Sequence, residues 1–194
     1  MWWLRELLSY FRFLAVTSDN PFWESKRVYE FVAPAIIAAA IFIVWLFVPG
    51  LFGPSFLGRF VGLLFQFMVF VVPFHLAALA AFATFERTGI DERLPGTDAE
   101  LLVWSNEDNA RVVKSLTLRQ YASLLFGYLC TIGIIFIVTY LFASNIEFRF
   151  VFVDAFYIVY AVCTLGMLFF VAHYAVLTAY AITFLFDKVN KIGK

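Results

Sequence analysis

Two histidines are the strongest candidates for chemistry in the most apolar parts of the chain. His75 lies in an apolar stretch at residues 60–85, and His173 lies in another at residues 155–186. Imidazole binds transition metals and exchanges a proton near neutral pH. If both stretches cross a membrane in the same direction, the two imidazoles lie at roughly similar depth. They could then pair, share a metal, act in gating, or each bond a neighbouring Thr, Tyr or carbonyl, which is the most frequent use of such side chains.

A second polar pattern runs along the stretch 155–186. Six residues recur there at spacings of four and three, and four of them carry a hydroxyl group: Tyr160, Thr164, Met167, Val171, Tyr174 and Thr178. This spacing places them on one face of a helix. This Tyr/Thr stripe could pack against other helices or line a water-filled path. With the histidines and one glutamine, it completes our set of intramembrane polar or gating candidates: His75, His173, Gln66, Tyr160, Thr164, Tyr174 and Thr178.

The same stretch carries a second face of small residues. These are Ala172, Ala175, Ala179 and Thr183. Small side chains let membrane helices approach closely, and hydroxyl groups can bond across the contact. This face is predicted to be a helix-packing or oligomer contact, so we expect a homo-oligomer.

The sequence lacks the residue sets that hydrolysis or group transfer requires. It contains no G-x-S-x-G, no H-E-x-x-H, no glycine-rich phosphate loop and no C-x-x-C. Cys130 and Cys163 show no metal-like spacing and are expected to be packing thiols. Within the four apolar stretches there is no Asp, Glu, Lys or Arg, the residue types that normally mark proton relays and ion-coupling sites. We therefore expect a protein that is not an enzyme, with no catalytic residues, metal or cofactor.

The composition places these candidates in a membrane protein. Of the 194 residues, 63% are hydrophobic and only 14% are charged, whereas about a quarter of a soluble domain is charged. The formal net charge is zero, which offers no basic patch for nucleic acid. The predicted class is an all-α, polytopic integral membrane protein that forms a single membrane domain over residues 1–194.

Four apolar stretches are long enough to cross the bilayer, which takes about 20 helical residues. They lie at about 31–48, 60–85, 121–143 and 155–186, and a capping box of Thr117 and Gln120 begins the third helix. Most Lys and Arg residues lie in the two ends of the chain and in the loop 86–118. The positive-inside rule therefore predicts that both termini and this loop are cytoplasmic. With no sorting signal, glycosylation acceptor or leader apparent, we expect a bacterial cytoplasmic (inner) membrane.

Two segments outside the spans have their own patterns. Residues 1–20 are predicted to form an amphipathic helix, either in the inner interface or packed on the cytoplasmic end of the bundle. Residues 86–118 are predicted to form short helices, because Thr97–Glu100 and Ser105–Asp108 fit capping boxes. This loop is either a solvated linker or a docking surface for a partner, and the docking candidates are Asp98, Glu100, Leu101, Leu102, Trp104, Glu107 and Asp108.

Together these patterns predict a non-enzymatic, oligomeric membrane module that senses or responds to a cytoplasmic protein partner. Such modules occur as membrane subunits of bacterial stress, toxin–immunity or antiviral defence systems. The alternative is an ion channel or pore lined by the Tyr/Thr stripe. The expected partners are the lipid bilayer, further copies of the chain and the cytoplasmic protein, with no direct nucleic-acid contact.

Overall fold

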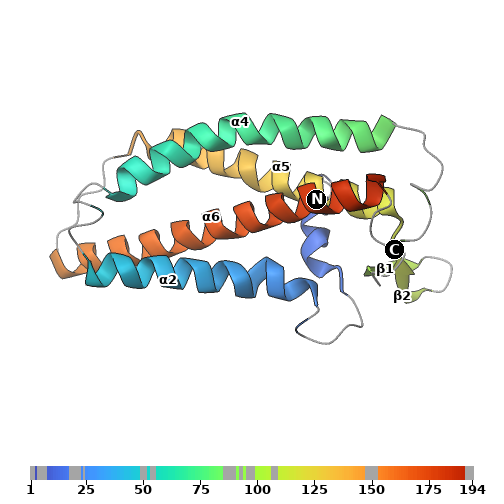
Figure 1. Cartoon of the computed structure of the whole chain (residues 1–194), viewed down its shortest axis with the longest axis horizontal. Coiled ribbons are helices and arrows are strands. Elements are labelled where there is room, and N and C mark those ends of the chain that lie inside the picture. Colours follow the sequence, from blue (N-terminus) through green and yellow to red (C-terminus); the bar gives the residue numbers. More distant parts are fainter. Residues whose placement is uncertain are drawn as a thin grey trace. The chain divides into compact units, whose positions relative to one another are not determined.

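The computed structural model is mostly helical (Figure 1). It describes residues 3, 8–17, 23, 25–48, 52, 56–84, 91, 94, 99–105, 109–146 and 153–190. In chain order the elements are the 3₁₀ helix η1 (Ser9–Ala15), the π-helical turn η3 (Val28–Val32), α2 (Ala33–Phe47), α4 (Phe56–Thr84), the strands β1 (Glu100–Ser105) and β2 (Ala110–Ser115), α5 (Leu118–Ala143) and α6 (Val153–Asn190).

The four predicted spans are confirmed as helices that are long and apolar enough to cross a membrane. They cover Val28–Phe47, Phe56–Thr84, Leu118–Ala143 and Tyr157–Phe186. The chain is thus a multi-pass membrane protein of the all-α class, with one β-hairpin added. The first three helices begin three or four residues before the predicted starts. Each of them therefore takes in a charged residue near its N-terminal end: Glu30, Arg59 and Arg119.

The chain forms two compact units, which are described separately. The first contains Met1–Lys26 and Val72–Ile132, and the second contains Arg27–Val71 and Gly133–Lys194. Helices α4 and α5 are each divided between the two units, α4 after Val71 and α5 after Ile132. The hairpin and η1 belong to the first unit, and α2 and α6 to the second.

In the first unit, η1 is held against the start of α5 by aromatic contacts. The fully buried Phe13 stacks on Tyr128 with ring centroids 5.4 Å apart and lies 6.0 Å from the Tyr121 ring. The buried Lys26 places its Nζ 3.5 Å from the centroid of the Phe13 ring and donates a hydrogen bond to the Phe13 carbonyl. Burying this ring and satisfying the ammonium group fixes η1 on α5.

The amphipathic helix predicted over residues 1–20 ends earlier than predicted in the part of the segment that the structure describes. The helix over the described part is of the 3₁₀ type and ends at Ala15, and Val16 is already extended. Thr17 then exchanges two backbone hydrogen bonds of 2.9 Å with Glu100, so it forms a one-residue bridge beside β1. The described part of this segment packs against α5.

The short helices predicted in the loop 86–118 are wrong for its longest described part, where Glu100–Ser105 and Ala110–Ser115 pair as the antiparallel strands of a hairpin. Its register pairs Leu102 with Val113 and Trp104 with Arg111. Leu, Val and Trp fit a pleated surface that is buried on one side, and Asn109, with φ 48°, adopts the left-handed conformation that turns tolerate. Thr17 pairs with Glu100 on the other side of β1. These contacts between distant segments therefore outweigh the local capping signals.

In the second unit, α2 packs along α6, and the two helices run side by side in Figure 1. The contact begins at η3, where Tyr29 stacks on Tyr180 with ring centroids 4.3 Å apart. It continues to Trp45, whose ring lies 5.9 Å from that of Tyr160. Ala38 is almost fully buried midway along α2. The small residue lets the two helices approach closely between their aromatic ends.

Candidate functional site

The buried side chain of His173 forms a hydrogen bond between α6 and η3 in the second unit. Its Nδ1 is 2.6 Å from the carbonyl oxygen of Glu30 in η3. A carbonyl can only accept, so Nδ1 carries the proton and donates. The imidazole also stacks on Phe31, at 5.7 Å, and on Phe169, at 6.0 Å. This is the carbonyl bond that the sequence analysis considered among its alternatives for His173.

The carbonyl that accepts this bond belongs to a π-helical turn. A π turn widens the helix and changes which groups its carbonyls face, and such turns are frequent at functional sites. The Glu30 side chain in the same turn is 1% exposed. A carboxylate in the first turn of a helix is favoured by the helix dipole. Sequence analysis missed this buried acid because the predicted span began at Phe31.

His75 lies in the first unit and is also buried. Its ring is 5.9 Å from that of Phe126 on α5. The two histidines belong to different units, and their pairing or sharing of a metal stays a prediction. Across the described residues there is no group of three or more His, Cys, Asp or Glu side chains that could hold a metal ion.

Most side chains of the Tyr/Thr stripe of α6 are buried or half-buried within the protein. Thr164 and Tyr174 are both fully buried. Thr164 donates to the Tyr160 carbonyl at 2.8 Å, while the Tyr160 hydroxyl accepts from the backbone N–H of Leu57 at 3.2 Å. Tyr174 meets Phe67 of α4 edge to face. Thr178 is half-buried, whereas Gln66 on α4 is exposed. These contacts are those of a helix-packing face.

The small-residue face of α6 is divided by the fold. Ala172 is buried, but Ala175, Ala179 and Thr183 are exposed in the single chain. Thr183 donates to the Ala179 carbonyl one turn earlier, at 3.0 Å. Three exposed residues at intervals of four therefore form a shallow stripe along one side of the helix.

The hairpin separates the predicted docking residues onto two faces. Leu101 is buried on the inner face, which also carries Val103. Leu102, Trp104 and Val113 point to the other face, where they are 55%, 59% and 60% exposed. We call these three residues the outer hairpin face. Glu100 is half-buried, and Asp98, Glu107 and Asp108 lie outside the described residues.

The two outer edges of the hairpin differ in their backbone pairing. On the β1 side, Glu100 pairs with Thr17. On the β2 side, Ala110–Ser115 pairs with β1 only, and no second strand among the described residues pairs with its other edge. The exposed charged side chains of β2 are Arg111 and Lys114, and the strand contains no acid.

Beneath the inner hairpin face lies a cavity of about 370 Å³. Its apolar wall comes from the hairpin and from Leu116 and Leu124, and its polar wall comes mainly from the first turns of α5. The lining residues are Tyr10, Leu101, Val103, Lys114, Leu116, Arg119, Gln120, Ser123 and Leu124. Two of them are basic and none is acidic.

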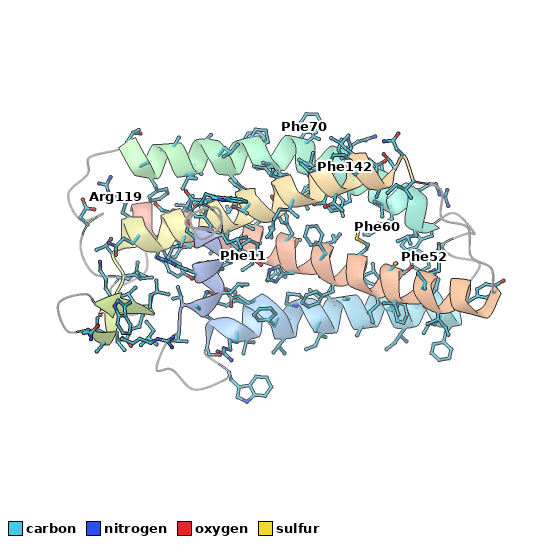
Figure 2. All side chains as sticks on the ribbon, turned by 180° about the vertical axis from the view of Figure 1, so that it is seen from behind. Phe11, Phe52, Phe60, Phe70, Arg119 and Phe142 are labelled. Carbon is cyan, nitrogen blue, oxygen red and sulfur yellow. The ribbon has the colours of Figure 1, made fainter. Side chains whose placement is uncertain are left out.

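Arg119 joins the ends of two helices beside this cavity, and its role was not predicted from sequence. Figure 2 labels it at the first turn of α5. Its Nε and one terminal nitrogen contact both carboxylate oxygens of Asp91, at 2.8 and 3.0 Å. The other terminal nitrogen donates to the Phe82 carbonyl at 3.2 Å, in the last turn of α4. The guanidinium thereby caps α4, whose final carbonyls have no partner within the helix.

The predicted capping box at the start of α5 is confirmed. The Thr117 backbone N–H donates to Gln120 Oε1, and the Gln120 N–H donates to Thr117 Oγ1, both at 3.3 Å. This reciprocal pair fixes the helix start from which Arg119 and Gln120 project.

Comparison with protein families, with curated proteins and with solved structures found no match to this chain.

Proposed function

We propose that the protein is a non-enzymatic membrane module whose hairpin docks a cytoplasmic protein partner. The single observation that carries this proposal is the outer hairpin face, where a leucine, a tryptophan and a valine are all more than half exposed on a well-formed strand pair. Apolar side chains gathered outside the membrane spans favour contact with another surface. Tryptophan is also among the residues that most often anchor protein interfaces.

The edge of β2, with which no second strand of the described residues pairs, supports a partner that binds in an extended conformation. An unpaired edge strand can accept one more strand through its backbone N–H and C=O groups. The added strand would place its own side chains beside Val113 and next to Arg111 and Lys114. Basic side chains on this edge favour acidic neighbours. The partner is therefore a protein that presents an extended segment in which apolar and acidic residues alternate.

The exposed small-residue stripe on α6 supports self-association within the membrane. Ala175, Ala179 and Thr183 allow a second helix to approach closely. A homo-oligomer formed there would present several hairpins to the partner, in the bacterial inner membrane with both termini cytoplasmic. Replacing Ala175 and Ala179 by Leu is expected to reduce the oligomer to monomer in native mass spectrometry. Val162→Leu, at an exposed and already large position of the same helix, is the control and should leave the oligomer intact.

The test of docking uses a photo-crosslinking amino acid at position 104 of the full chain in living cells. We expect a crosslink to one cytoplasmic protein, which is then identified and purified. Its affinity for the purified membrane protein should fall at least about tenfold when Leu102 and Val113 are both replaced by Ser, because losing two buried aliphatic contacts costs more than about 1.4 kcal/mol.

The control places the same crosslinker at Phe70, which is 71% exposed and points away from the α4 ribbon in Figure 2. That position is expected to react with lipid and not with the partner. A crosslink from position 104 only to lipid or to a second copy would contradict the docking proposal. So would an unchanged affinity in the double Ser variant.

A further inference from the structure

We infer that the cavity under the inner hairpin face binds the phosphate headgroup of an anionic phospholipid. The cavity combines two kinds of wall at the first turns of a membrane-spanning helix. The apolar surface comes from Leu101, Val103, Leu116 and Leu124. The side chains with N–H or O–H donors are those of Tyr10, Lys114, Gln120 and Ser123. An amphiphile with a charged head and an apolar body matches this division.

The charge of the site favours an anion. Among the described residues that line it, two are basic and none is acidic. Arg119 already holds Asp91 with two of its nitrogens and a helix carbonyl with the third. Lys114 is exposed, and it forms no salt bridge with any residue that the structure describes. One positive charge is thus available to an incoming ligand.

Further donors surround this lysine. The side-chain oxygen of Gln120 accepts the capping bond from Thr117, which leaves its amide N–H groups for another acceptor. Tyr10 and Ser123 also line the cavity, and each carries a hydroxyl group that can donate. A phosphate offers several acceptor oxygens and can use such a set of donors at once.

The position of the cavity identifies the source of the phosphate as a membrane lipid. Ser123 and Leu124 lie in the second turn of α5, within the segment Leu118–Ala143 that is apolar enough to cross the bilayer. The beginning of such a segment lies at headgroup level. Basic pockets at this depth are typical binding sites for anionic headgroups.

This inference is tested by counting lipids bound to the intact protein by native mass spectrometry. The purified full chain is mixed with phosphatidylglycerol or with phosphatidylcholine of the same acyl chains. We expect phosphatidylglycerol to bind with higher affinity, and Lys114→Gln to reduce its affinity about fivefold, the contribution typical of one basic residue at an anionic headgroup. Phosphatidylcholine binding should stay unchanged.

The matched control is Arg111→Gln. It removes one positive charge from the same strand, but Arg111 pairs with Trp104 and so shares the outer face, away from the cavity. Its phosphatidylglycerol affinity should equal that of the wild type. Equal losses in the two variants, or no preference for phosphatidylglycerol in the wild type, would overturn the inference.

A second arm separates a lipid from a soluble anion. Glycerol 3-phosphate carries the same phosphate without acyl chains, and at millimolar concentration it should not displace phosphatidylglycerol, because the apolar wall contributes to lipid binding. Displacement at that concentration would show a site for soluble phosphates and contradict the lipid assignment. The inference does not depend on the proposed protein partner, since lipid binding is measured on the purified chain without any cytoplasmic protein.

Discussion

Two buried polar residues of α6, His173 and Thr164, are placed where a backbone carbonyl accepts their hydrogen bonds. The imidazole of His173 donates to a carbonyl of a π turn and lies against two phenylalanine rings. The hydroxyl of Thr164 donates to a carbonyl in its own helix. In a hydrocarbon environment a polar group without such a bond is costly. These residues therefore contribute to helix packing first, whatever further role they have.

The contribution of the His173 bond can be measured by substitution. His173→Phe keeps a flat ring against Phe31 but removes the donor to the Glu30 carbonyl. We expect a loss of about 1 kcal/mol of stability, the usual net value of one buried hydrogen bond. The measurement is unfolding of the detergent-solubilised protein. His173→Gln, which restores an N–H donor, should recover part of the loss, and wild-type stability in the Phe variant would contradict this account.

Local rules predicted some residues well and missed others. The reciprocal bonds of Thr117 and Gln120 involve neighbours three residues apart, so their types and spacing were enough to predict them. The carbonyl of Glu30 meets His173 143 residues further along the chain. Neither the π turn nor that distant pairing has a signal in the local sequence. The same is true of Arg119, whose partners on α4 and in the loop are 28 to 37 residues away.

At the scale of the elements, the contact of η1 with α5 depends on a glycine. The Tyr10 ring lies directly over Gly127, and a Cβ at that position would collide with ring atoms. Gly127→Ala is therefore expected to push η1 away from α5 and to destabilise the protein by about 1–3 kcal/mol, as overpacking typically does. Thermal unfolding in detergent measures the effect.

Two further variants make this prediction specific. Tyr10→Ala should restore much of the stability lost in Gly127→Ala, because it removes the colliding ring. Gly166→Ala in α6 is the control, since no atom lies within 4 Å of the added Cβ. It should be neutral or slightly stabilising, because alanine favours a helix more than glycine does. Equal losses at both glycines would show that the Tyr10 contact is not the cause.

The connection between α4 and α5 depends on the shape of the Arg119 side chain as well as on its charge. A planar guanidinium can bond a carboxylate with one edge and a carbonyl with its other nitrogen, which a lysine cannot do. Arg119→Lys should therefore expose the last turn of α4 to faster amide hydrogen exchange, nearly as much as Arg119→Ala does. Asp91→Asn should have a smaller effect, because the Asp91 side chain is 70% exposed and such ion pairs contribute less than about 1 kcal/mol. Slow exchange in the Lys variant would rule out this role.

The hairpin was mispredicted because its local signals point in two directions. Thr97–Glu100 and Ser105–Asp108 have the residue types of helix starts, whereas the run Leu101–Trp104 is compatible with either structure. The strand pairing is decided by Val112 and Val113 of β2 and by the bridge to Thr17. These partners lie too far along the chain for a capping motif to report them.

For the whole molecule, composition was sufficient to predict the class. Four helices that can cross a membrane follow from four long apolar runs, because the bilayer requires about 20 apolar residues in each. The composition did not predict which face of each helix contacts protein and which face contacts lipid. Exposed phenylalanines such as Phe70 and Phe142 are as apolar as the buried Phe126, so only the fold separates them.

The central claim is that the outer hairpin face is accessible from the cytoplasm and is covered there by a partner. In a variant lacking Cys130 and Cys163, single cysteines are introduced at Trp104 and at Leu101, and their labelling by a membrane-impermeant maleimide is compared. We predict that position 104 reacts in inverted membrane vesicles but not in intact cells, and that 101 reacts slowly in both. Position 104 should also react faster in the purified protein than in vesicles that retain cytoplasmic proteins. Labelling of position 104 from outside the cell, or equal rates at the two positions, would contradict the account.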